Sequence, residues 1–129
     1  MLSVSQTVKN NAPTKKMDAL FFRKAFEHVL GKEYDLSLVF IGNKLSRKLN
    51  NAHRHIDKPT DVLSYPLDKK SGEIFINIPY SQKKCRSFDR LFPNYVKFIF
   101  IHGLFHLKGY EHGSRMEHEE KKVRIKFNI

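Results

Sequence analysis

The chain has 129 residues, a length that suits one domain spanning residues 1–129, and its hydrophobic share of 40% is too high for a disordered basic tail. The formal net charge of +11 favours a polyanionic partner such as nucleic acid or an anionic membrane surface, unless the lysines and arginines are only scattered over a solvated surface. The single cysteine, Cys85, excludes an intramolecular disulfide and fits a cytoplasmic protein, and no apolar stretch reaches the roughly 20 residues that cross a bilayer.

A strand and a helix are predicted in the first part of the chain. Residues 1–8 are expected to form a short strand. A helix is expected to open at Pro13 and Thr14 and to stop at Gly31, because apolar residues recur at helical spacing between these points. The residues expected on its inner face are Met17, Leu20, Phe21, Ala25, His28 and Val29.

The middle of the chain is predicted to hold three strands and a further helix. Residues 35–41 have the pattern of a buried strand, and Asn43 is predicted to cap the helix that follows. Residues 61–66 and 73–78 are predicted to pair as a hairpin, because the sequence Lys-Lys-Ser-Gly between them is typical of a turn. The residues expected on the inner face of the helix are Leu45, Leu49 and Ala52.

Two helices are predicted at the C-terminal end. The first has Pro93 in its first turn, runs to Leu107 and is ended by Gly109. The second is expected to open at Ser114 with a capping box that also uses Glu117. Its inner stripe is expected to consist of Met116, Val123 and Phe127.

A further feature of the last helix is that Glu120 stands four residues before Arg124, a favourable spacing for an ion pair. Taken together, these elements predict an α+β domain in which helices pack on a small mixed sheet of three to four strands.

Three histidines carry the clearest chemical signal in the sequence. His102 and His106 are four residues apart on a predicted helix, so both imidazoles emerge on one face. Gly109 can reverse the chain and bring His112 back over the same face. Three neutral imidazoles that converge in this way predict a zinc site on this helix and turn, with one open coordination position of the kind found in catalytic sites.

The neighbours of these histidines limit what the metal can do. The spacing is that of the extended zinc-protease motif His-Glu-x-x-His-x-x-Gly-x-x-His, but Gly103 stands where that motif has its general base. This argues against peptide hydrolysis and leaves Lewis-acid action on a phosphoryl oxygen open. Cys85 is expected to be a buried thiol and not a fourth ligand. His118 is a further candidate ligand or proton shuttle, with an exposed position on the last helix as the alternative.

A second motif runs from Arg54 to Pro66 with the sequence RHIDKPTDVLSYP. Arg54 and Lys58 lead directly into a predicted strand, and the planar guanidinium of Arg54 can clamp a phosphate. The alternative is a purely structural turn held by an Arg–Asp pair. Within the motif, Thr60 and Asp61 are expected to hydrogen-bond the local turn.

Together the segments RHIDKPTDVLSYP, GEIFINI and HGLFHLKGYEH resemble, in order and spacing, the YbeY family of bacterial endoribonucleases, which are also described as rRNA maturation factors. The resemblance covers about residues 35–120. Tyr65 stands where the family usually has Phe, and Glu111 where it usually has Asp. Neither departure touches a proposed metal ligand.

The resemblance implies an α+β fold that holds one Zn²⁺ on His102, His106 and His112, with Arg54 of the cleft engaging RNA. It further implies cleavage of single-stranded RNA, maturation of the 16S rRNA 3′ end and ribosome quality control in the cytoplasm. The expected partners are therefore 16S rRNA, the small ribosomal subunit and ribosome-associated proteins. A membrane partner is not expected, since the C-terminal segment is too rich in Glu for a membrane-surface helix.

The residues assigned to catalysis are Arg54, His102, His106 and His112, and those assigned to RNA or phosphate binding are Arg54 and Lys58. No general base can be identified, although Glu111 is the nearest acidic candidate and is expected to orient His112. Whether water or the RNA 2′-hydroxyl attacks stays open. Two rival functions remain, a non-catalytic ribosome assembly factor that zinc stabilises and an unusual metallopeptidase.

Overall fold

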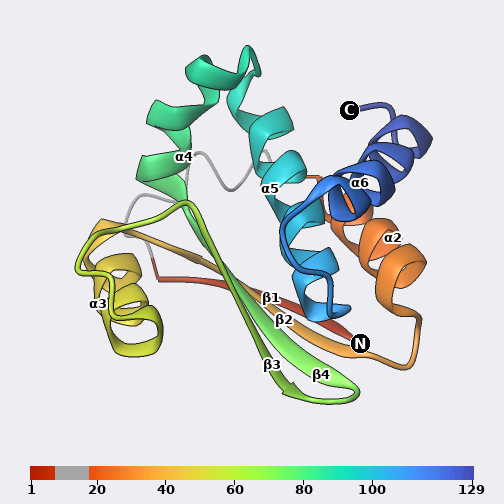
Figure 1. Ribbon diagram of the computed structural model, residues 1–129, viewed down its shortest axis with the longest axis horizontal. Coiled ribbons are helices and arrows are strands. Elements are labelled where there is room, and N and C mark those ends of the chain that lie inside the picture. The colour runs from red at the N-terminus through yellow and green to blue at the C-terminus, as the bar shows by residue number, and fades with distance from the viewer. Residues whose placement is uncertain (8–17) are drawn as a thin grey trace.

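The computed structural model describes residues 1–7 and 18–129 and has an α+β fold around one mixed four-stranded sheet (Figure 1). The strands lie in the order β1-β2-β4-β3. Strands β1, β2 and β4 are parallel, and β3 pairs with β4 as the predicted antiparallel hairpin. The predicted class and the mixed sheet are confirmed. The strand bounds are Leu2–Gln6 for β1, Asp35–Ile41 for β2, Val62–Asp68 for β3 and Ser71–Asn77 for β4.

One face of the sheet forms the floor of the hydrophobic core. In β2 and β4, alternate residues are buried, among them Leu38, Ile74 and Ile76, while Val39 and Phe75 on the other face are half-buried. This alternation is the period of two expected for strands whose two faces are covered unequally. The more deeply buried face of the sheet is therefore the face that most of the helices cover.

Helices α2 (Ala19–Leu30), α5 (Phe92–Leu107) and α6 (Ser114–Lys126) lie together on that side, and α3 (Asn43–Arg54) lies apart from them near one end of the sheet (Figure 1). Helix α5 is the central element, since it contacts β3 and β4 below it and α2 and α6 beside it. No helix in the described part of the chain has the length and apolarity needed to span a membrane.

Helix α4 (Ile78–Lys84) and the 3-10 helix η1 (Cys85–Phe88) connect β4 to α5 and were not predicted from the sequence. Helix α4 starts immediately after β4, where the side chain of Asn77 accepts a hydrogen bond from the backbone N–H of Tyr80 at 3.2 Å. No helix or strand was predicted in this segment, but the cap formed by Asn77 starts a short helix there. Cys85 is buried at the junction, which confirms the predicted buried thiol.

The helix predicted near the N-terminus corresponds to α2, whose first residue is Ala19. The predicted start at Pro13 and Thr14, and the inward position of Met17, lie outside the described residues. Helix α2 follows Asp18, whose side chain accepts a hydrogen bond from the N–H of Phe21 at 3.1 Å. The predicted inward position of Leu20 is wrong, because its side chain is 48% exposed.

Two predicted side-chain caps are wrong. The N-cap of α3 is Gly42 and that of α6 is Gly113, and neither makes a side-chain capping bond. The side chain of Asn43 instead accepts a hydrogen bond from the Asn77 amide at 2.9 Å. Ser114 is the first residue of α6 and not its cap, so the predicted capping box does not form.

The inner face of α3 is more polar than predicted. Ser46 and Asn50 are its buried residues, and the predicted Leu45 and Leu49 are half-buried, whereas Ala52 is exposed. The Ser46 hydroxyl accepts a hydrogen bond from the Thr60 N–H at 2.9 Å, and the Asn50 amide donates to the Lys58 carbonyl at 2.9 Å. Helix α3 therefore fixes the backbone of residues 58–60, which lead into β3 and into the cleft described below.

Helix α5 approaches the sheet closely at Gly103. A Cβ atom at this position would lie 2.8 Å from the Ser64 hydroxyl oxygen and 3.2 Å from Cδ1 of Ile74. The Ser64 hydroxyl also donates to the Gly103 carbonyl at 3.2 Å. Close packing therefore requires a glycine at this position. Position 103 faces the sheet, so it lies away from the side of α5 that carries His102 and His106.

Candidate metal centre and cleft

The three predicted ligand histidines meet in space. His102 and His106 lie one turn apart on α5, and Gly109, with φ of +103°, reverses the chain so that His112 returns to the same place. One ligand nitrogen from each imidazole lies within 4.8 Å of the other two, so the group can hold a metal ion. The sequence prediction of a metal site on this helix and turn is confirmed in its geometry.

The spacing of the imidazole nitrogens fits a shared ion. Nε2 of His102 and Nε2 of His106 are 3.1 Å apart. A tetrahedral ion with metal–nitrogen bonds of about 2.0–2.1 Å, the length usual for zinc, places two ligand nitrogens about 3.3 Å apart. The separation of these two Nε2 atoms is thus close to that required for both to bind one ion.

The other ring nitrogens are fixed by partners behind the site. Nδ1 of His102 donates to the Glu120 carboxylate at 2.6 Å, and Nδ1 of His106 donates to the carbonyl oxygen of Tyr110 at 3.1 Å. Such bonds set the tautomer in which Nε2 carries the lone pair that a metal needs. Burial and the neighbouring His102 ring lower the pKa of His106, which also favours the neutral imidazole.

Glu120 belongs to the candidate site and was not predicted from the sequence as part of it. It was expected to pair with Arg124, but its side chain is buried and contacts His102. Its spacing in the sequence indicates a buried position. Residue 120 lies four residues after Met116 and three before Val123, so it falls on the predicted inner stripe of the last helix. Glu111, which was expected to orient His112, is exposed and makes no hydrogen bond to it among the described contacts.

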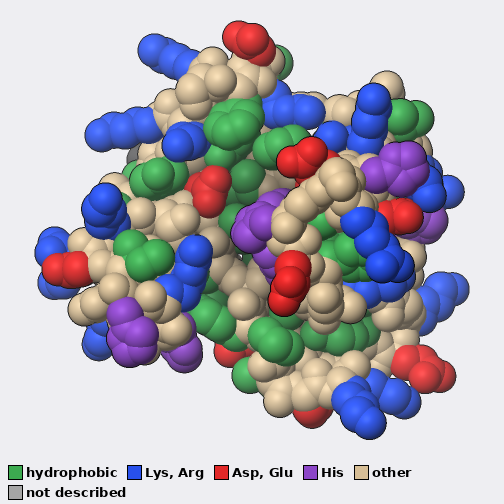
Figure 2. Space-filling model, in the orientation of Figure 1, with side chains coloured by type: hydrophobic (Ala, Val, Ile, Leu, Met, Phe, Trp, Pro, Cys, Tyr) green, Lys and Arg blue, Asp and Glu red, His purple; other side chains and the backbone are tan. Residues whose placement is uncertain are grey.

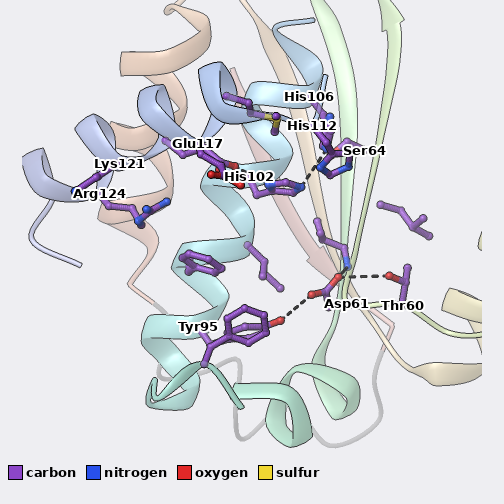
Figure 3. Close-up of a pocket in the computed structure, with 18 of the residues that line it drawn as sticks. Thr60, Asp61, Ser64, Tyr95, His102, His106, His112, Glu117, Lys121 and Arg124 are labelled. Atoms are coloured by element: carbon purple, nitrogen blue, oxygen red, sulfur yellow. Dashed lines mark hydrogen bonds and ion pairs between the residues drawn. The ribbon is translucent and has the colours of Figure 1, made fainter. Parts of the chain in front are cut away.

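The histidines lie in a cleft of about 1200 Å³. Helix α5 contributes Tyr95, His102 and His106, and the turn that follows it contributes His112. The α6 residues Glu117, Lys121 and Arg124 lie on one side of the cleft, and Thr60 and Asp61 lie on the other (Figure 3). Figure 2 shows one group of histidine side chains near the centre of this face and others toward its edges, with Lys and Arg side chains spread over the face. The cleft itself is lined by both signs of charge, with Arg54, Lys121 and Arg124 beside Asp61, Glu117 and Glu120.

A buried tyrosine ties the two sides of the cleft together. The hydroxyl of Tyr95 on α5 donates to the Asp61 carboxylate at 2.7 Å, and the N–H of Val62 donates to the other carboxylate oxygen at 2.8 Å. Burial and the bond to Asp61 raise the pKa of Tyr95 well above its ordinary value. The predicted turn bond is present too, since the Thr60 hydroxyl donates to Asp61 at 3.4 Å.

The structure separates the two predicted phosphate-binding residues. Arg54 ends α3, is exposed and lines the cleft, whereas Lys58 is exposed but is not among the residues that line it. The turn does contain an Arg–Asp pair, but Asp57 pairs with Arg47, at 2.7 and 3.0 Å. The bond from Arg47 lowers the pKa of Asp57. Arg54 takes part in none of the ion pairs found among the described residues.

The remaining histidine of the cleft is not part of the metal group. His118 lines the cleft from α6 and is exposed, but the group of converging ligand atoms within the described residues contains only His102, His106 and His112. The fold and site thus define an α+β protein with three histidines that can hold a metal ion, and three is the number of protein ligands typical of catalytic sites that keep a position open for water or substrate.

Comparison with known proteins gives the family. The family model for endoribonuclease YbeY matches residues 4–127. An endoribonuclease YbeY of Persephonella marina is 28% identical over 134 aligned residues, which cover 98% of this chain and 85% of the relative. Another, from Pelagibacter ubique, is 34% identical over 116 residues, covering 84% of this chain and 75% of the relative. The chain belongs to the YbeY family of endoribonucleases.

The fold also resembles that of a solved structure. The solution structure of TM1509 from Thermotoga maritima superposes with a TM-score of 0.64 and covers 99% of this chain and 92% of its own. Sequence identity between the two is 23%, so this likeness concerns the fold alone.

Proposed function

We propose that this protein is a zinc-dependent endoribonuclease that cleaves single-stranded rRNA in the cytoplasm. Its substrate is the precursor of the 16S rRNA 3′ end, and it acts on the small ribosomal subunit in maturation and quality control. The observation that carries the proposal is the pair of Nε2 atoms, 3.1 Å apart, in a cleft that Arg54 also lines. Family membership supports the reaction type, since the relatives are named endoribonucleases.

Zinc is the proposed ion because three neutral imidazoles form a donor set that suits it. When bound, the ion would supply Lewis-acid stabilisation of charge on the phosphoryl oxygens and lower the pKa of a water molecule. The ligands would be His102, His106 and His112. Glu120 and the Tyr110 carbonyl would hold two of these rings in place by their bonds to Nδ1.

Arg54 is proposed to hold the RNA phosphate beside the histidines. Its guanidinium has five N–H donors and no carboxylate partner among the described ion pairs, so it is free to bind a phosphate in the bidentate manner. Lys58 is proposed to attract RNA from outside the cleft as a point charge. Asp61 would help to keep the cleft open through its bond to Tyr95.

The decisive experiment is cleavage of ribosome-derived RNA by the zinc-loaded protein, with mapping of both product ends. We expect cuts in single-stranded regions, including one at the 16S 3′ end, and none when the same segment is annealed to its complement. The chemical nature of the new 3′ ends also identifies the attacking oxygen, because a 2′,3′-cyclic phosphate requires the 2′-hydroxyl. Zinc-loaded protein that leaves the RNA intact but still supports ribosome maturation would point to the non-catalytic assembly factor instead.

Arg54 and Lys58 provide a matched pair for testing phosphate binding. Arg54→Ala is expected to raise the Kd for single-stranded RNA about 10-fold, because it removes a charge-assisted contact inside the cleft. Lys58→Ala should weaken binding less, since an exposed charge outside the cleft is screened by salt. Titration of labelled RNA at two salt concentrations measures both effects. Equal losses in the two variants would contradict the assignment of Arg54 to the cleft phosphate.

A further inference from the structure

An exposed aromatic ring lines one end of the cleft. Phe88, the last residue of η1, packs its ring 5.5 Å from that of Tyr95 and 5.9 Å from that of Phe98, measured between centroids. Tyr95 is fully buried, but Phe88 is 47% exposed and lines the same cleft as the histidines. Hydrophobic side chains gather on the face over η1 and the start of α5, beside the histidine group (Figure 2). One aromatic surface is therefore left uncovered within a cleft that both basic and acidic side chains line.

Two arginines accompany this aromatic cluster. The guanidinium carbon of Arg90 lies 4.4 Å from the centre of the Phe98 ring, and that of Arg124 on α6 lies 5.2 Å from the same centre. Arg90 donates to the neutral side chain of Asn94. Neither arginine takes part in an ion pair among the described residues, although Glu117 lines the same cleft. Burial and the charge of Arg124 lower the pKa of Arg90, as expected for like charges held close together.

The cluster lies next to the metal centre along α5. Phe98 is four residues before His102, a separation of about 6 Å along the helix, and Tyr95 is a further turn away on the same face. An RNA strand with a phosphate at the histidines therefore has an adjoining nucleotide at the aromatic cluster.

We propose that Phe88 is a stacking platform for an unpaired RNA base beside the scissile phosphate, and that Arg124, which lines the same cleft, holds a phosphate next to it. Single-stranded nucleic acid is commonly bound by aromatic rings that stack bases and by basic groups that follow the backbone. Base stacking needs an accessible aromatic ring, and Phe88 is 47% exposed. Phosphate binding needs a guanidinium without an acidic partner, and Arg124 has none among the described ion pairs. Such a platform selects for bases that are not paired in a duplex. This inference rests on the proposed function, because it assigns a subsite of the same cleft.

The test uses the full-length, zinc-loaded protein and single-stranded RNA that carries 2-aminopurine at successive positions. Stopped-flow fluorescence is recorded in the phase that precedes any cleavage. Wild-type protein is expected to quench the probe at one position, and Phe88→Ala to abolish this quenching and raise the Kd between about 5-fold and 150-fold. Phe88→Trp should preserve both, whereas Phe88→Leu should not. Leu91→Ala is the control, since Leu91 is 81% exposed nearby but does not line the cleft.

Two further measurements complete the test. An abasic nucleotide at the quenched position should make the Kd insensitive to Phe88→Ala, and Arg124→Gln should make the slope of log binding constant against log salt shallower by about 0.7. The proposal is overturned if Phe88→Ala binds within twofold of wild type, or if Phe88→Leu binds as well as wild type, because the exposed ring would then serve an apolar partner. Stacking without cleavage would refute the proposed nuclease function and leave this subsite intact.

Discussion

Replacing His102 and His106 together by Ala is expected to leave the protein folded but without its metal ion. Two of the three converging ligands are lost, and a single imidazole cannot hold zinc against water. The fold should persist because its core is formed by the sheet, α2 and α5, with neither histidine in the buried cluster. Elemental analysis should find about one zinc per wild-type chain and almost none in the variant, while circular dichroism remains similar.

The same variant is expected to lose RNA cleavage by about a thousandfold or more, since a catalytic metal provides several kcal/mol of transition-state stabilisation. His118→Ala is the matched control for metal content, because it removes an imidazole that lines the same cleft but lies outside the ligand group. Added zinc should raise the Tm of the wild type and of His118→Ala, but not that of the double variant. Equal zinc in all three proteins would refute the site.

Replacing Glu120 is expected to weaken metal binding although this residue touches no metal. Its carboxylate accepts the Nδ1 proton of His102 at 2.6 Å and is buried, so Glu120→Ala leaves that N–H without a partner and frees the ring to rotate. Losing such a partner typically lowers metal affinity about 10-fold to 100-fold. Glu120→Gln should lower it less, because the amide oxygen can still accept the same hydrogen bond without the negative charge.

Competition with a chromogenic zinc chelator measures these affinities. Glu119→Gln serves as the control, because Glu119 is the neighbouring acid, pairs with Lys122 at 3.3 Å and does not line the cleft. The control should bind zinc as the wild type does. An affinity for Glu120→Ala within twofold of the control would show that the bond to His102 has no influence on the metal.

The metal centre could be predicted because its geometry is local. His102, His106 and His112 are brought together by one helical turn and one glycine turn, so their spacing in the sequence determines their positions. The hairpin of β3 and β4 was predictable for the same reason. Glu120 and Tyr95 act across elements, and only the packing of α6 on α5 or of α5 on β3 reveals their partners.

The errors made from sequence have a common physical origin. Asn43 and Ser114 have the residue types of helix caps, but Asn43 is instead bound by Asn77 and Ser114 lies one position inside its helix. Ala52 fits an apolar stripe, but α3 turns polar Ser46 and Asn50 inward to hold the loop before β3. In each case a tertiary hydrogen bond or a one-residue shift outweighs the local preference.

The close approach at Gly103 means that this metal helix cannot be converted into the helix of a zinc protease by a single substitution. A glutamate there would have to enter the space between α5 and the sheet, where even one added carbon meets Ser64 and Ile74. The spacing of the histidines is thus shared with the protease motif, but the position at which that motif has its general base here faces the sheet and not the cleft. An engineer who wanted a base in this cleft would have to install it on α6 or at the start of β3.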